Sequence, residues 1–436
     1  MKINRETDNL IKKNNAKNFS AFLVLILAVV CFVGGYFFNL IIKGDDLRTV
    51  EWVLDTVNKY GYYLDEDTGE LKKLTGKEVA DSIVNTFLDD YSNYYTADEY
   101  SDVVETNKGN NFGVGVSLLS STTDLKIFRV IGNSPAYYSG LKSGDILVGA
   151  KKVDGDRQEF ISRKDFTDFL SSVERDEEFI LFATRDGVEN SFTVAKRVFI
   201  SSFVTYFDNQ TKGYFTVAGG SLAFTTEASL EMQSLPDGVA YIGYQSFTGK
   251  SDYEIKTVME YIKAQGKTGV ILDLRDNGGG QMKILESVSS YFIKKDGVEN
   301  PVIVKAKDND GRWENYTAKG SNFVDSVEKV VVLANKYTAS ASECLIGAML
   351  HYGKAFSRSN LVIENGDGMT GRTYGKGIMQ TTFKNTFTGE ALKITTARLY
   401  FPDGKTSIHG KGIHTVALNM VLPQNALDRA IELFND

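Results

Sequence analysis

Two short motifs contain the residue types that hydrolysis by a serine with a lysine base requires. The first, Lys336–Glu343, places Ser340 among small residues shortly after the apolar run Val330–Ala334. We expect that run to be a buried strand and residues 342–352 to be a helix, with Ser340 at the turn between them. Free N–H groups at the start of such a helix point toward whatever Ser340 attacks. A plain helix-capping role for the serine cluster is the alternative.

The second motif, Tyr374–Gln380, places Lys376 between two glycines. A serine hydroxyl is a weak nucleophile until a neighbouring base removes its proton. Lysine serves as that base only when burial or nearby positive charge keeps its amine neutral. On a strand, Lys376 and Gln380 would share one face, as an oriented base and its amide partner require. The alternative is a solvated surface lysine.

A third motif, Gly269–Gly280, consists of an apolar run, a polar turn and three consecutive glycines. Glycines at the end of a strand let backbone N–H groups approach a ligand atom closely. We expect the N–H groups of Gly279 and Ala341, with Gly278 or Gly280 as substitutes, to form an oxyanion hole. An ordinary strand-to-helix turn is the alternative, and the spacing of a phosphate-binding loop is absent.

Together, these motifs resemble those of the C-terminal processing (tail-specific) serine proteases, in the order that the family shows. The resemblance covers residues 47–436 and extends to a further stretch, Leu392–Ile413. It implies that Ser340 is the nucleophile, Lys376 the general base and Gln380 the residue that orients the lysine. It also implies a protease core of the ClpP/crotonase-like spiral type.

The chain departs from the family pattern at three places. Asn277–Gly280 replaces the usual Asn-Pro-Gly-Gly turn, and His414-Thr415 replaces a Pro-Asp pair. A glycine-rich loop, Glu364–Gly371, lengthens the interval between serine and lysine. This loop is interpreted as a lid or a longer turn.

Residues 109–198 resemble a PDZ domain, through Phe112–Val116 and Asn133–Leu147. In such a domain, successive backbone N–H groups of a glycine loop bind a peptide's terminal carboxylate, and a strand edge adds the peptide as a new strand. The expected substrate-binding residues are those of the glycine loop: Phe112, Gly113, Val114, Gly115 and Val116. A plain hairpin turn is the alternative.

The N-terminus carries a predicted membrane anchor. Residues 19–42 are 24 residues without a charge, long enough to cross a hydrocarbon core of about 30 Å. Five basic and two acidic residues precede this run, so residues 1–18 are expected in the cytoplasm and the remainder outside. A cleaved signal peptide is the alternative, but the run is long and no Ala-x-Ala site follows it.

Composition favours a large protein body outside the membrane, of two to three domains. The 436 residues carry a net charge of −7, which disfavours a nucleic-acid partner. Cys31 and Cys344 are the two cysteines, so no disulfide framework or metal-binding spacing is expected. The three histidines sit in no pattern that suggests a base.

The predicted architecture is α/β, since strands and helices alternate in residues 199–436, the expected protease core with its C-terminal helix. Residues 43–108 read as a helical region that resembles the pairing region of the family, so a homodimer is a plausible inference. Tyr206–Pro236 has no assignable role.

The sequence thus predicts a single-pass membrane-anchored serine endopeptidase that cleaves proteins near free C-termini, without cofactor or metal. A non-catalytic PDZ-bearing membrane scaffold is the main alternative. An acyl-CoA enzyme of the related spiral fold is a weaker one.

Overall fold

The computed structural model describes residues 45–60, 73–118, 125–228, 234–293, 296–319, 326–353, 355–365 and 371–435. The predicted tail at 1–18 and membrane helix at 19–42 lie outside these ranges. Within them, no helix has both the length and the apolar character that crossing a membrane requires. The chain divides into two compact units, residues 1–86 and residues 87–436.

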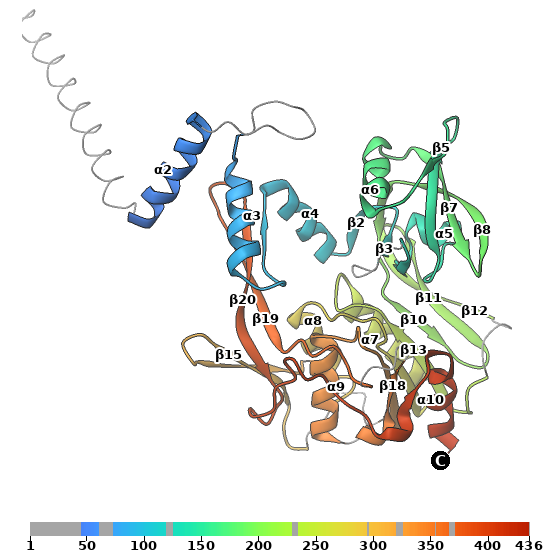
Figure 1. Cartoon of the computed structure of the whole chain (residues 1–436). Helices are drawn as coiled ribbons and strands as arrows, with labels where there is room; N and C mark the ends of the chain where they lie inside the picture. Colours follow the sequence, from blue (N-terminus) through green and yellow to red (C-terminus); the bar gives the residue numbers. More distant parts are fainter. Residues whose placement is uncertain are drawn as a thin grey trace, which may run out of the picture. The chain divides into compact units, whose positions relative to one another are not determined.

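The described part of the first unit is helical, as the sequence predicts (Figure 1). It contains α2 (Asp45–Tyr60) and α3 (Gly76–Phe87), which ends at the unit boundary. The predicted capping box is present, because Thr75 N–H donates to Glu78 Oε2 at 2.8 Å and Glu78 N–H donates to Thr75 Oγ1 at 3.2 Å. Asn58 of α2 bonds the segment just before α3, because its Nδ2 donates to Leu74 O and its Oδ1 accepts from the Leu74 N–H.

An eight-stranded sheet forms the centre of the second unit. Its strands are β10 (Val204–Phe207), β11 (Thr211–Ala218), β12 (Ser221–Ala228), β13 (Val239–Tyr244), β14 (Gly269–Asp273), β17 (Lys329–Ala334), β18 (Leu361–Glu364) and β21 (Met420–Val421). They lie in the order β12-β11-β10-β13-β14-β17-β18-β21. The pairings from β13 to β21 are parallel, and those of β10, β11 and β12 are antiparallel.

Helices cover both faces of this sheet, so its central strands are apolar on both sides. The helices are α7 (Ser251–Ala264), α8 (Met282–Ser289), α9 (Ala341–Tyr352) and α10 (Ala426–Asn435). On β14, Val270 and Leu272 join the core under α7, α8 and α9, whereas Ile271 joins the cluster with α10. Successive residues of β14 thus face opposite sides of the sheet, and both sides are covered. This explains why the sequence of the strand is a continuous apolar run. The short helices η2 (Arg358–Asn360), η3 (Ala417–Asn419) and η4 (Pro423–Asn425) flank the last strands.

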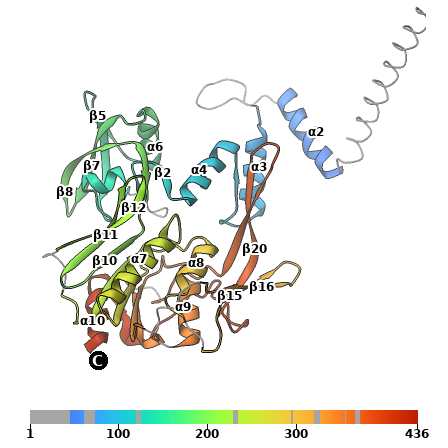
Figure 2. The same cartoon turned by 180° about the vertical axis from the view of Figure 1, so that it is seen from behind.

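A second sheet contains the hairpin that follows the predicted lysine. Its strands are β1 (Asn93–Tyr95), β15 (Val302–Asp308), β16 (Trp313–Thr317), β19 (Ile378–Lys384) and β20 (Ala391–Tyr400). The long β19–β20 hairpin is plain in Figure 2, and β1 pairs with β20 on its other edge. Helix α4 (Ala97–Asn107) follows β1 directly.

The PDZ-like segment forms three small sheets with its own apolar core. Its elements are β2 (Asn110–Gly113), β3 (Val116–Leu118), β4 (Ile127–Val130), α5 (Pro135–Ser139), β5 (Ile146–Lys152), β6 (Gln158–Glu159), α6 (Arg163–Ser172), β7 (Glu178–Arg185), β8 (Val188–Ala195) and β9 (Arg197–Ile200). The order β6-β5-β7-β8 makes a four-stranded sheet, and β2–β9 and β3–β4 are separate pairs. Strand β9 runs past residue 198, where the sequence places the end of this segment.

Tyr206–Pro236, the stretch without an assigned role, contains the hairpin β11–β12. Eight residue pairs join its strands, from Thr211 opposite Ala228 to Ala218 opposite Ser221. Strand β12 is an edge of the central sheet. The hairpin therefore widens that sheet, and its rings Phe215 and Phe224 pack against Tyr253 and Tyr261 of α7.

Candidate active site

Two neighbouring parallel strands carry the serine motif and the glycine motif to the same edge of the central sheet. Strand β14 ends at Asp273 and β17 at Ala334, and the turns that follow them bond to each other. Thr338 Oγ1 donates to Leu274 O at 2.8 Å, and Ala339 N–H donates to Asn277 O at 3.0 Å. Parallel strands in an open α/β sheet bring functional loops together at their carboxyl ends in this way.

Ser340 lies at the turn from β17 into α9, as the sequence predicts. Its backbone has φ 57° and ψ −117°, a conformation that residues other than glycine rarely adopt. Such conformations cost about 1–3 kcal/mol and occur at functional sites that the surrounding structure holds in place. Ser342, the neighbouring serine, is fully buried and donates through Oγ to Asn277 O at 3.0 Å.

The glycine turn packs directly against the backbone of Ser340. A Cβ placed on Gly279 would lie 2.7 Å from Ala341 N and 2.8 Å from Ser340 Cβ, so only glycine fits there. The Gly279 N–H itself donates to Asn277 Oδ1 at 2.9 Å. Ala341 is the first residue of α9, where no intrahelical acceptor serves the backbone N–H.

Lys376 lies in the segment between β18 and β19, and its side chain is half-buried. Burial, assisted by the positive charge of Lys393, lowers the pKa of Lys376 to about 8. Its Nζ lies over the ring of Tyr91, 4.4 Å from the ring centroid. The shifted pKa is the property that the lysine needs to act as a base near neutral pH.

A buried carboxylate joins the serine and lysine segments. Glu343 Oε2 accepts from the backbone N–H groups of Ser340 and Lys376, each at 2.9 Å. Its Oε1 accepts from Thr373 Oγ1 at 2.5 Å and from the Gly375 N–H at 2.8 Å. Burial raises the pKa of Glu343, and the four donors oppose that shift. The sequence motif includes Glu343, but sequence reasoning assigned it no role.

Gln380 lies on β19 and bonds away from the lysine. Its Nε2 donates to Thr395 Oγ1 at 3.0 Å. Lys376 precedes the start of β19, and the register shifts between Met379 and Gln380. The alternation of side chains along a strand therefore does not place Lys376 and Gln380 on one face.

One cleft of about 740 Å³ brings most of the predicted site residues together. It is lined by Ser340, Lys376, Gln380, Gly278, Gly279 and Gly280, among others. The predicted peptide loop 112–116 does not line it. No histidine lines it either, although all three histidines lie within the described ranges.

Comparisons with known proteins point to one peptidase family. Residues 238–415, which contain both turns and the lysine, match the family model of Peptidase family S41. This segment is an S41 peptidase domain. The S41 match ends before α10 and begins after the PDZ-like segment.

Curated relatives extend the likeness beyond the S41 domain. A probable CtpA-like serine protease of Staphylococcus haemolyticus is 26% identical over 84% of this chain and 64% of its own length. Its counterpart in Staphylococcus aureus is 26% identical over 89% of this chain and 69% of its own. The chain thus spans less than two thirds of the S. haemolyticus relative. A solved photosystem II D1 C-terminal processing protease has 21% identity and a TM-score of 0.49, covering 88% of this chain and 90% of that one.

Tyr91 is a residue of the S41 cleft that sequence reasoning did not assign to the site. Besides facing Lys376, its hydroxyl bonds the Tyr374 hydroxyl at 3.0 Å. It stands in the turn before β1, far from the other site residues in sequence. The sequence offered a signal in the stretch Asp89–Tyr95, which resembles a turn of the C-terminal processing proteases.

The PDZ-like segment supplies a wall of the S41 cleft. Phe128 and Arg129 of β4 line it. The Arg129 guanidinium donates to Asp276 O, and the ring of Phe128 meets Tyr337 edge-on with centroids 5.2 Å apart. The segment predicted to read peptide tails thus contacts the turns beside Ser340.

The predicted carboxylate loop is held by its carbonyl groups. Val114 O accepts from the Ala136 N–H and Gly115 O accepts from the Ile131 N–H, both at 2.9 Å. The ring of Phe112 is 55% exposed and lies near the positive charges of Arg175 and Lys196. Positive charge beside the loop favours an anionic ligand.

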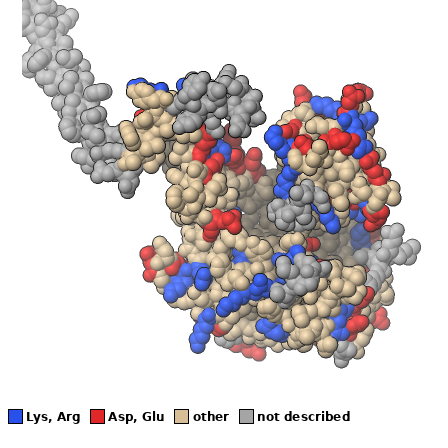
Figure 3. Space-filling model, in the orientation of Figure 1, with Lys and Arg blue, Asp and Glu red and all other residues tan. Residues whose placement is uncertain are grey.

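Cys344 is excluded as a nucleophile by its surroundings. It is 1% exposed inside α9, and burial raises the pKa of its thiol. Cys31, the other cysteine, lies outside the described residues. On the face shown in Figure 3, both acidic and basic side chains are present over the second unit.

Proposed function

We propose that the protein is a serine endopeptidase in which Ser340 is the nucleophile and Lys376 the general base. The observation that carries this proposal is the elbow geometry of Ser340, whose N–H shares the Glu343 carboxylate with the Lys376 N–H. The lowered pKa of Lys376, about 8, supports the base role. The S41 match supports the reaction class.

In the proposed reaction, Ser340 Oγ attacks the scissile carbonyl while Lys376 Nζ takes the hydroxyl proton. Lys376 then gives that proton to the leaving amine, and an acyl-enzyme remains on Ser340. Water resolves the acyl-enzyme with the lysine again acting as base. For this exchange, Nζ, which lies over the Tyr91 ring, must come within hydrogen-bond distance of Ser340 Oγ.

The developing oxyanion requires donors beside Ser340. The Ala341 N–H at the start of α9 is the first donor. Gly279 is the second once its bond to Asn277 Oδ1 opens, with Gly278 and Gly280 in the same cleft as alternatives. Gln380 would hold Lys376 after its side chain exchanges Thr395 for the lysine amine.

Substrate selection and location complete the proposal. The loop Phe112–Val116 would bind a free C-terminal carboxylate, supported by the positive charges near Phe112. Residues 19–42 would anchor the chain in the membrane as a single pass, with residues 1–18 cytoplasmic and the S41 domain outside. Pairing through the helical region would give a homodimer.

A fluorophosphonate probe with the purified full chain tests the catalytic proposal. We expect covalent labelling at Ser340 and degradation of casein, and neither reaction in Ser340→Ala. Unlabelled protein that still binds peptides with free C-termini would instead identify a PDZ-bearing scaffold.

Peptide pairs test the tail-reading proposal separately. Amidation removes the terminal charge that backbone N–H groups recognise. We expect about tenfold slower cleavage of an amidated peptide than of its acid form, the scale of one charged hydrogen bond. Equal kcat/KM for the two forms would remove tail recognition but leave the peptidase proposal intact.

A further inference from the structure

Strand β9 has one paired edge and one open edge. In the part of the chain that the structure describes, β9 pairs only with β2. On the β2 side, the Ser201 N–H donates to Gly109 O at 2.9 Å. On the opposite side, the Ser202 N–H donates to Gly132 O at 3.2 Å, and Lys196 O accepts from the Asp176 N–H at 2.9 Å.

Backbone groups of Val198 and Ile200 face this open edge. The polar backbone groups of successive residues alternate between the two sides of a strand, so these residues point to the same side as Lys196 and Ser202. The edge is closed at residue 196 and again at residue 202. Two N–H groups and two C=O groups between those points therefore await a partner strand.

The chain turns away from β9 at Asn133, which leaves the edge uncovered. Asn133 has φ 64°, a left-handed conformation, and the next residues start α5. Its side chain is 6% exposed and lines the pocket beside β9. Asn133 Oδ1 accepts from the Tyr138 hydroxyl at 3.0 Å, but Nδ2 has no partner among the described residues. A buried amide donor without an acceptor is costly, and a peptide carbonyl would satisfy it.

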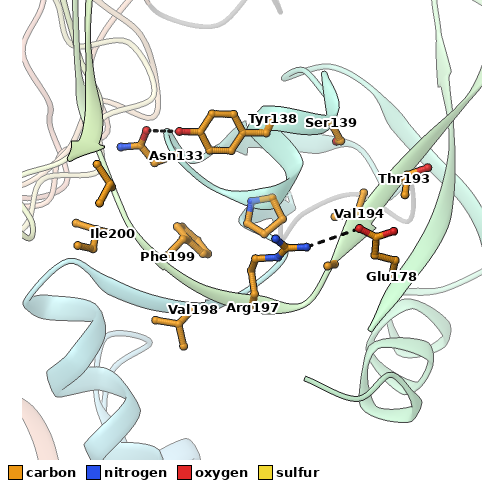
Figure 4. A pocket seen from close by; sticks show the side chains of 13 residues that line it. Asn133, Tyr138, Ser139, Glu178, Thr193, Val194, Arg197, Val198, Phe199 and Ile200 are labelled. Atoms are coloured by element: carbon orange, nitrogen blue, oxygen red, sulfur yellow. Dashed lines mark hydrogen bonds and ion pairs between the residues drawn. The ribbon is translucent and has the colours of Figure 1, made fainter. Parts of the chain in front are cut away.

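The open edge lies in a pocket of about 480 Å³ (Figure 4). Phe199 lies at its centre, with Tyr138 of α5 on one side and Val194 of β8 on the other. Val217, near the tip of the β11–β12 hairpin, completes the lining. The hairpin, for which no role was predicted, thus contributes to the wall of this pocket.

We propose that β9 binds an extended polypeptide segment by strand addition, in a site separate from the S41 cleft. Main-chain hydrogen bonds to Val198 and Ile200 would provide sequence-independent affinity, and the apolar lining would favour an apolar side chain. The occupant is a segment of the polypeptide substrate. That identity rests on the proposed peptidase function, whereas strand addition itself does not.

A second site of this kind suits an enzyme that acts on long, unfolded chains. Binding an upstream segment at β9 raises the effective concentration of the remaining chain near the cleft. Short substrates that occupy only the cleft would not gain from it. The site therefore favours extended chains over short peptides and folded domains.

Hydrogen exchange with a blocked peptide tests the proposal directly. The probe is the heptapeptide acetyl-Ser-Thr-Val-Thr-Val-Thr-Ser-amide, which has no free carboxylate, added to full-length Ser340→Ala. At a concentration of about ten times the dissociation constant, exchange of the Val198 and Ile200 amides should slow about tenfold. The same peptide with proline replacing the central threonine should bind at least about tenfold more weakly, because proline cannot complete the ladder.

Two variants locate the binding, and a third is a matched control. Val217→Asp introduces a charge into the apolar wall at a residue 43% exposed, and Val198→Pro removes an edge N–H. Each should weaken binding of the heptapeptide, measured by fluorescence anisotropy, about tenfold or more. This is the scale of one lost contact or hydrogen bond. Val188→Asp, on the adjacent strand β8 at a residue 63% exposed and outside the pocket, should bind as the parent does.

Three results would overturn the proposal. The first is peptide-induced protection confined to the S41 cleft, and the second is unchanged binding in Val217→Asp. The third is slow exchange of Val198 and Ile200 in the free protein that depends on protein concentration, since a second copy would then cover the edge.

Failure of the peptidase proposal would look different. In that case casein would stay intact while the heptapeptide still protected β9. Conversely, casein cleavage without protection at β9 would remove only the second site.

Discussion

The serine half and the lysine half of the cleft are built in different ways. Ser340 is positioned by backbone: a strained φ, a glycine packed against its Cβ, and hydrogen bonds between the two turns. Glu343 holds the N–H groups of both residues, but the ammonium of Lys376 is placed by a side chain, because it lies over the ring of Tyr91. The position of the serine thus depends on backbone geometry, whereas that of the lysine ammonium depends on a contact with a side chain.

Glu343 makes the two halves one unit. A carboxylate with donors on both oxygens, inside a core, loses several hydrogen bonds at once if either segment moves. Glu343 thereby links the Ser340 and Lys376 backbones through one carboxylate oxygen.

The largest expected effect concerns the serine half. Ser340→Ala removes the nucleophile and should lower kcat/KM for casein-derived peptides by at least about a thousandfold, with the melting temperature retained. Ser342→Ala is the matched control two residues away. Its buried bond to Asn277 O contributes about 1 kcal/mol to stability, so its activity should fall only a few fold. Comparable losses in both variants would show that the elbow is structural.

The lysine half should be almost as sensitive, but with a pH signature. Only the neutral amine accepts a proton, so kcat/KM should rise as pH increases through about 8 and then level off. Lys376→Arg should lose at least about a hundredfold, since arginine stays protonated in proteins. Robust activity in Lys376→Arg, or a rate independent of pH between 6 and 10, would contradict the lysine base.

The backbone-built half is also the half that the sequence predicts well. The apolar run before the turn and the helix after it are found as β17 and α9, within one residue of expectation. Strand periodicity, glycines and small residues report directly on backbone geometry. These features together predict the turn at Ser340 between the strand and the helix.

The lysine half shows what sequence patterns do not contain. Alternation along a strand suggests that Lys376 and Gln380 share a face, but the lysine precedes β19 and a register shift intervenes. Tyr91 reaches the site through a distant turn, and the role of Glu343 depends on donors from two segments. Such contacts arise from tertiary packing, which no local periodicity records.

Glu343→Gln tests the link between the halves. The amide has one acceptor oxygen, so two of the four donors lose their partner, and kcat/KM should fall about tenfold to a hundredfold. Loss of the negative charge near Lys376 should also lower the lysine pKa, because that charge favours the ammonium. The acid limb of the pH profile should therefore move below 8.

Glu254→Gln is the matched control for this variant. Glu254 is also fully buried, and its Oε2 accepts from Ser202 and from the Phe203 and Val204 N–H groups, all at 2.9 Å. It lies on α7, away from the lining of the S41 cleft. Its substitution should alter thermal stability and leave the acid limb unchanged. An equal shift in the acid limb of the kcat/KM profile in both variants would show that Glu343 has only a structural role.

The smallest expected effect concerns the ring that faces the lysine. A cation over an aromatic face is stabilised by about 0.5–1 kcal/mol, whereas a leucine of similar bulk offers burial without that attraction. Tyr91→Leu should therefore lower the lysine pKa by about half a unit, since one unit corresponds to 1.36 kcal/mol. At pH 7, below the pKa, the neutral fraction and kcat/KM should rise about two- to threefold, while rates above pH 9 stay the same. Tyr91→Phe keeps the ring and loses only the bond to Tyr374, so its profile should match the parent's. If kcat/KM of Tyr91→Leu were lower than the parent's at every pH, the ring would instead position the lysine for catalysis.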